Sequence, residues 1–344
     1  MRYNKLHIDS RFVFESGESI PSLDLVYHTS DRDYTPSEKV VWICHALTGN
    51  SNPEDWWGQM VGKGCLFDPE EYYIVCVNIL CSPYGSSGPS SINPETGKPY
   101  LLSFPRTTIR DIVNANILVR KHLGIESIDL MLGPSIGGFQ ALEWAVMERD
   151  VIKEVVFLAT SDRVTPYLTA FNESQRMALL ADPSFMAAQS LDGGKAGLAC
   201  ARSIALISYR TFEGYNLTQK EKDDDTLFAD RACSYQRYQG KKLVDRFDAY
   251  SYWYLTYSLD SQNIGRGRGG VEAALSTLKS RCHVIGIDSD VLFPPAHGRK
   301  TAADIGNADY HELSSIFGHD GFLVENDSLI QILKPILESS MNRK

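Results

Sequence analysis

The sequence of 344 residues lacks long apolar runs and has no excess of positive charge. No stretch approaches the roughly 18 uncharged apolar residues of a membrane-spanning helix, and residues 1–5 lead into no apolar segment typical of a secretion signal. The net charge of −9 argues against a nucleic acid or an anionic membrane as a partner. We therefore expect a cytoplasmic protein whose partners include no nucleic acid and no membrane.

Cysteine pairs and metal-ligand motifs are also missing. The seven cysteines form an odd set without a Cys-x-x-Cys pair, and Cys44 and Cys76 lie in strand-like runs, where a thiol behaves as a small hydrophobic group. This pattern argues against a disulfide framework and favours reduced thiols. Since neither His-Glu-x-x-His nor a spaced Cys/His ligand set occurs, we expect no metal site.

What is present is an alternation of strand-like and helical segments. Residues 39–44 and 72–78 are continuous apolar runs of the kind that is buried on both faces of a parallel sheet. Thr108 and Asp111 form a capping-box pattern at the start of a helical stripe. The alternation predicts an α/β fold in which a mostly parallel sheet is flanked by helices.

The pattern changes between residues 161 and 270. This segment is rich in Tyr, Arg, Lys and Asp and lacks continuous strand-like runs, while residues 187–203 and 226–238 have a helical pattern. We interpret the segment as a helical lid insertion placed over the C-terminal edge of the sheet. The predicted organisation is an α/β core formed by residues 1–160 and 271–344, with a lid formed by residues 161–270.

A serine lies between two glycines at a predicted strand-to-helix junction. The segment Gly133-Pro134-Ser135-Ile136-Gly137 follows an apolar strand pattern and precedes a helical one. Strand, Gly-x-Ser-x-Gly and helix in this order are typical of a nucleophile elbow. Glycine is needed on both sides because a Cβ there would collide with neighbouring backbone. The elbow lifts the hydroxyl clear of the sheet above a helix N-terminus, so we predict that Ser135 is a nucleophile.

A serine nucleophile needs a base, and four histidines follow Ser135 in the sequence. His283 lies in an apolar strand pattern and His297 at a predicted helix start, so we interpret both as packing or surface residues. His311 falls in the region of the penultimate predicted strand. His319 lies in a glycine-flanked loop between the last predicted strand and the last predicted helix, where the base of such an elbow belongs. We predict that His319 is the base.

The base in turn needs an orienting carboxylate, and two aspartates follow the strand-like residues 284–287. Both lie beyond the end of a strand, where catalytic groups collect. We favour Asp290 because its Asp-x-x-x-Pro spacing places it in the turn before the next helix. Asp288 is the second candidate; if Asp290 is the acid, we expect Asp288 to satisfy backbone donors of that turn.

The tetrahedral intermediate of acyl transfer needs two backbone N–H donors for its oxyanion. One is expected from Ile136, the residue after the nucleophile, at the N-terminus of the helix. The other is expected from the loop of residues 44–49, and we name the Leu47 amide. His45 in the same loop is interpreted as a bracing residue rather than a second base.

Several sequence segments together resemble one enzyme family. The chain is similar to the homoserine O-acetyltransferases and to the related homoserine and serine O-succinyltransferases. The matching segments occur in the family's order and span nearly the whole chain: His-Ala-Leu-Thr-Gly at 45–49, Gly-Ser-Ser-Gly-Pro-Ser-Ser-Ile-Asn-Pro at 85–94, and the segments at 133–138, 140–144, 237–240, 246–249, 265–270, 288–295 and 318–323.

The resemblance implies an α/β-hydrolase fold and an acyl-CoA:homoserine O-acyltransferase that serves methionine biosynthesis. It implies a ping-pong mechanism in which Ser135 accepts the acyl group from acyl-CoA, with acetyl-CoA favoured, and then passes it to the hydroxyl of L-homoserine. Acetyl-CoA is then a co-substrate, and no bound cofactor is expected. The resemblance also implies a homodimer that forms through the lid.

The resemblance further assigns substrate-binding residues, position by position. Arg202 is expected to bind the α-carboxylate of the amino acid, for which its planar guanidinium is suited, and Asp320 to hold the α-ammonium group. Tyr209 is expected to assist, and Thr48 to line the oxyanion loop.

The chain also departs from the family pattern. Pro134 stands where the family usually has glycine, and Ile136 where methionine is common. The departures leave open a homoserine O-succinyltransferase or a serine O-acyltransferase. An esterase or thioesterase with the same triad is a further hypothesis, and so is a non-catalytic binding protein of this fold.

Overall fold

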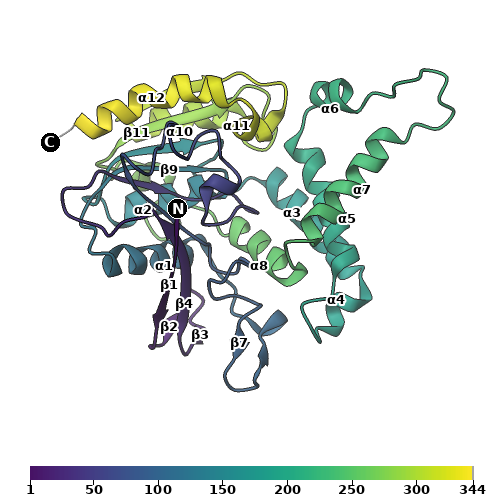
Figure 1. Cartoon of the computed structure of the whole chain (residues 1–344), viewed down its shortest axis with the longest axis horizontal. Coiled ribbons are helices and arrows are strands. Elements are labelled where there is room, and N and C mark those ends of the chain that lie inside the picture. The colour runs from purple at the N-terminus through teal and green to yellow at the C-terminus, as the bar shows by residue number, and fades with distance from the viewer. Residues whose placement is uncertain (343–344) are drawn as a thin grey trace.

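The computed structural model describes residues 1–342, which fold around one eight-stranded sheet (Figure 1). The strand order is β1-β4-β6-β5-β9-β10-β11-β12. Strands β5, β6 and β9 to β12 run parallel, while β4 pairs antiparallel with β6 and with β1. The prediction of a mostly parallel sheet is confirmed. The strands are β1 (Arg2–Ile8), β4 (Leu23–Thr29), β5 (Val40–Ile43), β6 (Tyr73–Val77), β9 (Ile128–Pro134), β10 (Ile152–Leu158), β11 (Arg281–Ile287) and β12 (Ala308–Leu313).

Two short antiparallel pairs lie outside this sheet. They are β2 (Phe12–Val13) with β3 (Ser19–Ile20), and β7 (Ile92–Asn93) with β8 (Lys98–Pro99). Three short 3-10 helices lie in the segments that connect the strands and α-helices: η1 (Pro53–Asp55), η2 (Leu101–Ser103) and η3 (Gly318–Asp320).

Helices cover both faces of the sheet, which explains the continuous apolar runs in the sequence. Along β5, Val40 and Trp42 belong to one apolar layer, and Val41 and Ile43 to the other. The first layer contains side chains of α1 (Ile109–His122), α2 (Ile136–Met147), α9 (Val271–Leu275) and α10 (Pro295–Ile305). The second contains side chains of α11 (Gly321–Val324) and α12 (Asn326–Asn342). The predicted capping box at Thr108 and Asp111 is present at the start of α1.

Between residues 161 and 270, helices α3 to α8 stand beside the sheet in a group of their own (Figure 1). Helix α3 packs on α5 and α8, and α5 packs on α7. Helix α8 is tied to the core because Tyr254 donates its hydroxyl to Leu102 O at 2.8 Å. These helices are α3 (Pro166–Leu180), α4 (Pro183–Ala187), α5 (Lys195–Tyr209), α6 (Phe212–Gln219), α7 (Arg231–Val244) and α8 (Ala249–Asp260).

The helices α5 and α7 begin later than the sequence pattern predicts. The expected helix at 187–203 starts only at Lys195, because Gly194 caps it with a positive φ of 78° in the left-handed region. The expected helix at 226–238 starts at Arg231. The boundaries of the lid at residues 161 and 270 stay a prediction. No helix within residues 1–342 is both long enough and apolar enough to cross a membrane.

Candidate active site

Ser135 lies in the sharp turn between β9 and α2. Its φ of 57° and ψ of −122° place it in a conformation that L residues rarely adopt, a strain typical of functional turns. A Cβ on Gly133 would lie 2.3 Å from the Gly137 carbonyl, and a Cβ on Gly137 would lie 2.1 Å from the carbonyl oxygen of Cys44. The backbone therefore requires glycine on both sides of the serine, as the sequence pattern predicts.

His319 and Asp290 are joined by a short hydrogen bond in the interior. Nδ1 of His319 donates to Oδ2 of Asp290 at 2.6 Å, and both side chains are buried. The other carboxylate oxygen, Oδ1, accepts from the backbone N–H groups of Leu292 and Phe293 at 2.8 and 3.0 Å. Because a carboxylate only accepts, the His319 proton sits on Nδ1, and Nε2 keeps a lone pair that can take a proton.

Electrostatics strengthens the basicity of His319. Burial by itself would lower the pKa of the imidazole, but the Asp290 carboxylate, with a smaller contribution from Asp320, outweighs it and raises the pKa above 6.5. The ring is enclosed by aromatic side chains, with the Phe293 and Phe322 ring centroids 5.2 and 5.5 Å away. This dry, negatively biased environment suits a group that must accept a proton and hold it briefly.

Asp288, the second candidate for the acid, braces a loop instead of contacting His319. Its Oδ2 accepts from the Ser314 hydroxyl at 2.7 Å and its Oδ1 from Ser315 N at 3.0 Å. We expected it to satisfy donors of its own turn, whereas the donors come from the segment after β12. Ser289, which the sequence analysis did not single out, also joins the two loops, since its hydroxyl accepts from Gly318 N and donates to Ser315 O.

A cavity of about 70 Å³ brings the predicted reacting and binding groups together. Asp290 and Ile136 are buried and do not line it. A second small cavity, of about 20 Å³, shares Ser135, Leu47 and Tyr209 with the first. The first cavity is lined by Ala46, Leu47, Thr48, Ser135, Arg202, Tyr209, His319, Asp320, Phe322 and Leu323.

The loop expected to supply the second oxyanion donor is held by buried hydrogen bonds. Nδ1 of His45 donates to Ala46 O at 2.8 Å, and Nε2 accepts from Ile79 N at 3.0 Å. Burial lowers the pKa of His45 to about 4, so the ring is neutral and braces the loop, as the sequence analysis proposed. From the lid side, Arg246 donates to Thr48 O at 2.6 Å. The oxyanion roles of Leu47 and Ile136 stay predictions.

Helix α5 of the lid lines the cavity with Arg202 from its middle and Tyr209 from its last position, and Arg210 follows directly after it. Arg202 places its guanidinium carbon 5.7 Å from the centre of the Tyr209 ring. Nε of Arg210 donates to Oδ2 of Asp320 at 2.6 Å. A Cβ on Gly318 would lie 2.8 Å from Tyr209 O, so the end of α5 packs directly on the histidine loop. Sequence reasoning missed Arg210, whose only signal is its position next to Tyr209.

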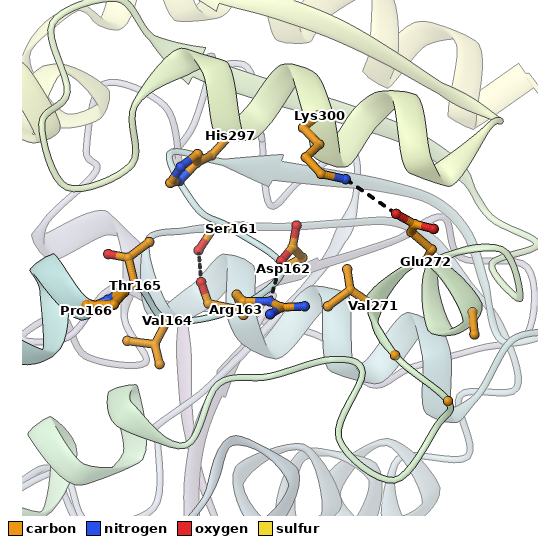
Figure 2. A pocket seen from close by; sticks show the side chains of 13 residues that line it. Ser161, Asp162, Arg163, Val164, Thr165, Pro166, Val271, Glu272, His297 and Lys300 are labelled. Atoms are coloured by element: carbon orange, nitrogen blue, oxygen red, sulfur yellow. Dashed lines mark hydrogen bonds and ion pairs between the residues drawn. The ribbon is translucent and has the colours of Figure 1, made fainter.

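A larger cavity of about 610 Å³ lies apart from these groups, between the start of α3 and the helices α9 and α10 (Figure 2). Its charged side chains pair with one another: Arg163 lies 3.6 Å from Asp162, and Lys300 lies 3.8 Å from Glu272. None of the predicted site residues lines it. The smaller cavity, which is lined by both Ser135 and His319, is therefore the candidate active site.

Comparison with known proteins places the chain in a family. The family model for the alpha/beta hydrolase fold matches residues 39–325. A homoserine O-acetyltransferase of Cyclobacterium marinum is 43% identical over 323 residues, which cover 93% of this chain and 91% of that protein. The chain belongs to the homoserine O-acetyltransferase family. The resemblance found in the sequence and the predicted α/β-hydrolase fold are thereby confirmed.

Solved structures with this fold include both transferases and hydrolases. A homoserine O-acetyltransferase from Bacillus anthracis superposes with a TM-score of 0.90 at 22% identity, covering 100% of this chain and 98% of that chain. An acetylester hydrolase from Corynebacterium glutamicum superposes with a TM-score of 0.86 at 22% identity, covering 98% of this chain and 96% of that chain. At such identities the likeness shows the fold alone. The fold therefore does not distinguish a transferase from a hydrolase, and the side chains around Ser135 must be considered instead.

Proposed function

We propose that the protein transfers an acetyl group from acetyl-CoA to the hydroxyl of L-homoserine, a step of methionine biosynthesis. The observation that carries this proposal is the single cavity in which Ser135 and His319 lie beside a cation, Arg202, and an anion, Asp320. Water needs no such pair of charges, whereas an amino-acid acceptor carries a carboxylate and an ammonium group to match them. Membership of the homoserine O-acetyltransferase family supports the same acceptor.

In the first half-reaction, the acetyl group moves from sulfur to oxygen. Nε2 of His319 takes the proton of the Ser135 hydroxyl as Oγ attacks the thioester carbonyl. The Asp290 carboxylate stabilises the imidazolium that forms. The amides of Leu47 and Ile136 are proposed to hold the oxyanion, the C–S bond breaks, and the CoA sulfur takes the proton from His319. The products are acetyl-Ser135 and free CoA.

In the second half-reaction, the homoserine hydroxyl replaces the serine. His319 takes its proton as the hydroxyl oxygen attacks the acetyl-Ser135 carbonyl, and returns that proton to Ser135 Oγ as the ester bond breaks. Arg202 is proposed to bind the α-carboxylate and Asp320 the α-ammonium group. Since Arg210 already occupies one oxygen of Asp320, the ammonium is assigned to the other. The reaction uses acetyl-CoA as a co-substrate and needs no bound cofactor.

We also propose that two copies associate through the lid. Large apolar side chains are exposed on several lid helices and on the loop between α6 and α7, which favours burial against a second molecule. All seven cysteines are unpaired, in keeping with the cytoplasmic location that we propose. The exposed apolar side chains of the lid are Tyr167, Met177, Leu180, Met186, Ile207, Phe212, Leu217, Leu227, Phe228 and Tyr238.

The test follows the release of free CoA thiol from acetyl-CoA or succinyl-CoA, each with homoserine, with serine, or without an acceptor. We expect release from acetyl-CoA that depends on homoserine and is lost in Ser135→Ala. Equal release without any amino acid would make the protein a thioesterase and would remove the roles given to Arg202 and Asp320. Preference for succinyl-CoA or for serine would keep the mechanism and change the substrates.

A further inference from the structure

A row of ionisable side chains crosses three strands at the end of the sheet remote from Ser135. Glu154 lies on β10, His283 on β11, and Asp309 and His311 on the edge strand β12. In the strand register, Glu154 pairs with Arg281, and His283 pairs with Asp309. Because side chains alternate along a strand, all four point to the same face of the sheet. Their neighbours on that face, such as Ile285, belong to the apolar layer beneath α12.

The ligand atoms of His283, Asp309 and His311 lie close enough together to share one ion. Nδ1 of His283 lies 3.2 Å from Nε2 of His311 and 3.9 Å from Oδ2 of Asp309. One ligand atom from each of these three residues lies within 4.8 Å of the other two. Two nitrogens that bind one tetrahedral zinc ion at about 2.0–2.1 Å are about 3.3–3.4 Å apart. The two histidines therefore already stand at nearly the separation that a shared ion imposes.

Glu154 orients the buried histidine toward that shared position. Nε2 of His283 lies 2.7 Å from Oε1 of Glu154, and the carboxylate only accepts, so the ring proton belongs on Nε2. Nδ1 then offers its lone pair to the space between His311 and Asp309. In metal sites, the histidine nitrogen that does not bind the ion commonly donates its N–H to a carboxylate, which fixes the tautomer and the orientation of the ring.

We propose that His283, Asp309 and His311 bind one divalent transition-metal ion of the zinc class, with Glu154 as the positioning residue. Two imidazoles and one carboxylate suit zinc, and a water completes the tetrahedron. His283 is buried while Asp309 is exposed, so the ion can reach the site from solvent. The ion would link β11 to the edge strand β12. Since His283 lies near the start of β11 and Asp290 follows its end, the role is structural rather than catalytic.

Arg281 is the natural competitor of the ion. Its guanidinium pairs with Oδ2 of Asp309 and also donates to Oδ1 of Asn307 at 2.9 Å. When the ion binds, Arg281 gives up Asp309 and keeps Asn307. Removing this positive charge with Arg281→Gln should therefore tighten metal binding, which a purely structural ion pair would not predict.

The test measures zinc affinity on the full chain after removal of metal with a chelator. Cys200 and Cys233 are exposed free thiols, and because thiolates are zinc ligands, every variant carries both as serine to exclude them as a competing site. A zinc-sensitive dye serves as the competitor. We expect one zinc ion per chain, with affinity at least tenfold lower in His311→Gln and Asp309→Asn, 10- to 100-fold lower in Glu154→Gln, and higher in Arg281→Gln. The matched control is His122→Gln, which removes an exposed histidine of α1.

Two results would overturn the proposal: the absence of stoichiometric binding in the parent chain, or an unchanged affinity in His311→Gln. A folding defect is distinguished by the homoserine-dependent release of CoA, which His311→Gln should retain because the residue lies away from the reacting groups. Cobalt supplies an independent readout, since the intense visible absorption of a tetrahedral cobalt ion should appear in the parent chain and be lost in His311→Gln. Cobalt absorption of equal strength in both would assign the metal to other residues.

Discussion

Nδ1 of His319 lies 2.6 Å from Oδ2 of Asp290, while the other oxygen of the same carboxylate is held by two backbone N–H groups. The turn before α10 thus fixes the carboxylate, and the carboxylate fixes the tautomer and the orientation of the imidazole. In the chemistry we propose, this relationship decides whether Nε2 of His319 can take a proton from Ser135.

The first prediction concerns the acid. Asp290→Asn keeps the shape of the side chain but can donate to Nδ1, which favours the wrong tautomer of His319. We expect kcat for homoserine-dependent CoA release to fall by roughly 10³- to 10⁴-fold. The matched control is Asp288→Asn, which weakens a brace on Ser314 and Ser315 but does not touch the imidazole. A loss in Asp288→Asn as large as that in Asp290→Asn would contradict our assignment.

The second prediction concerns pH. Because Asp290 raises the pKa of His319 above 6.5, the base is protonated and inactive over a wider acidic range than a free imidazole. We expect kcat/KM to rise with pH through a midpoint above 6.5, and Asp320→Asn to move the midpoint lower by removing a nearby negative charge. A midpoint at or below 6.5, or an unmoved midpoint in Asp320→Asn, would argue against this electrostatic account.

The raised pKa of His319 also affects stability, and the pH dependence of this effect is opposite to that of activity. A histidine whose pKa is higher in the folded than in the unfolded chain stabilises the fold when it is protonated. For His319 this contribution is present below pH 6.5 and is lost as the pH rises through the folded-state pKa. Activity therefore increases over the pH range in which this contribution declines. Chemical denaturation of the parent chain and of Asp290→Asn across this pH range measures the difference between their free energies of unfolding.

Much of the site could be predicted from the sequence because its constraints are local. The turn around Ser135 admits only glycine at positions 133 and 137, and this leaves a readable Gly-x-Ser-x-Gly pattern. His319 is placed by its loop between the last strand and the last long helix. Asp288 and Asp290 both follow β11, so their positions in the sequence do not separate them; only the direction of each side chain does.

Other features depend on contacts between distant segments and have no local signal. The ion pair of Arg210 with Asp320 joins the lid to the histidine loop across 110 positions, and no pattern near either residue indicates it. The row of His283 and His311 arises from the register of β11 on β12. The sequence, which has no compact ligand motif, therefore predicts no metal site, whereas the strand register brings suitable ligands together.

The third prediction concerns the amino-acid acceptor. Arg202→Gln removes the cation assigned to the α-carboxylate, and a hydrogen bond to a charged group contributes roughly 1.5–3 kcal/mol. We expect kcat/KM for homoserine to fall by about 10- to 150-fold, while the first burst of CoA from acetyl-CoA keeps its rate. Arg202→Lys should recover little, because a lysine cannot bind the carboxylate with two parallel hydrogen bonds. Equal loss in both half-reactions would instead indicate a general role of Arg202 in the lid.

The last prediction concerns the elbow. A Cβ on Gly137 would lie 2.1 Å from the carbonyl oxygen of Cys44, directly after β5, and neither backbone can retreat from the centre of the sheet. We expect Gly137→Ala to lower the free energy of unfolding by roughly 3 kcal/mol, the upper end of overpacking costs.

The matched control is Gly306→Ala at the end of α10, where φ is +73° but no atom lies within 4 Å of the added Cβ. There only backbone strain of about 1–2 kcal/mol is expected. Denaturant titration of the two variants compares the costs directly. If Gly137→Ala cost no more than Gly306→Ala, the close approach of α2 to Cys44 would not be what requires glycine at position 137.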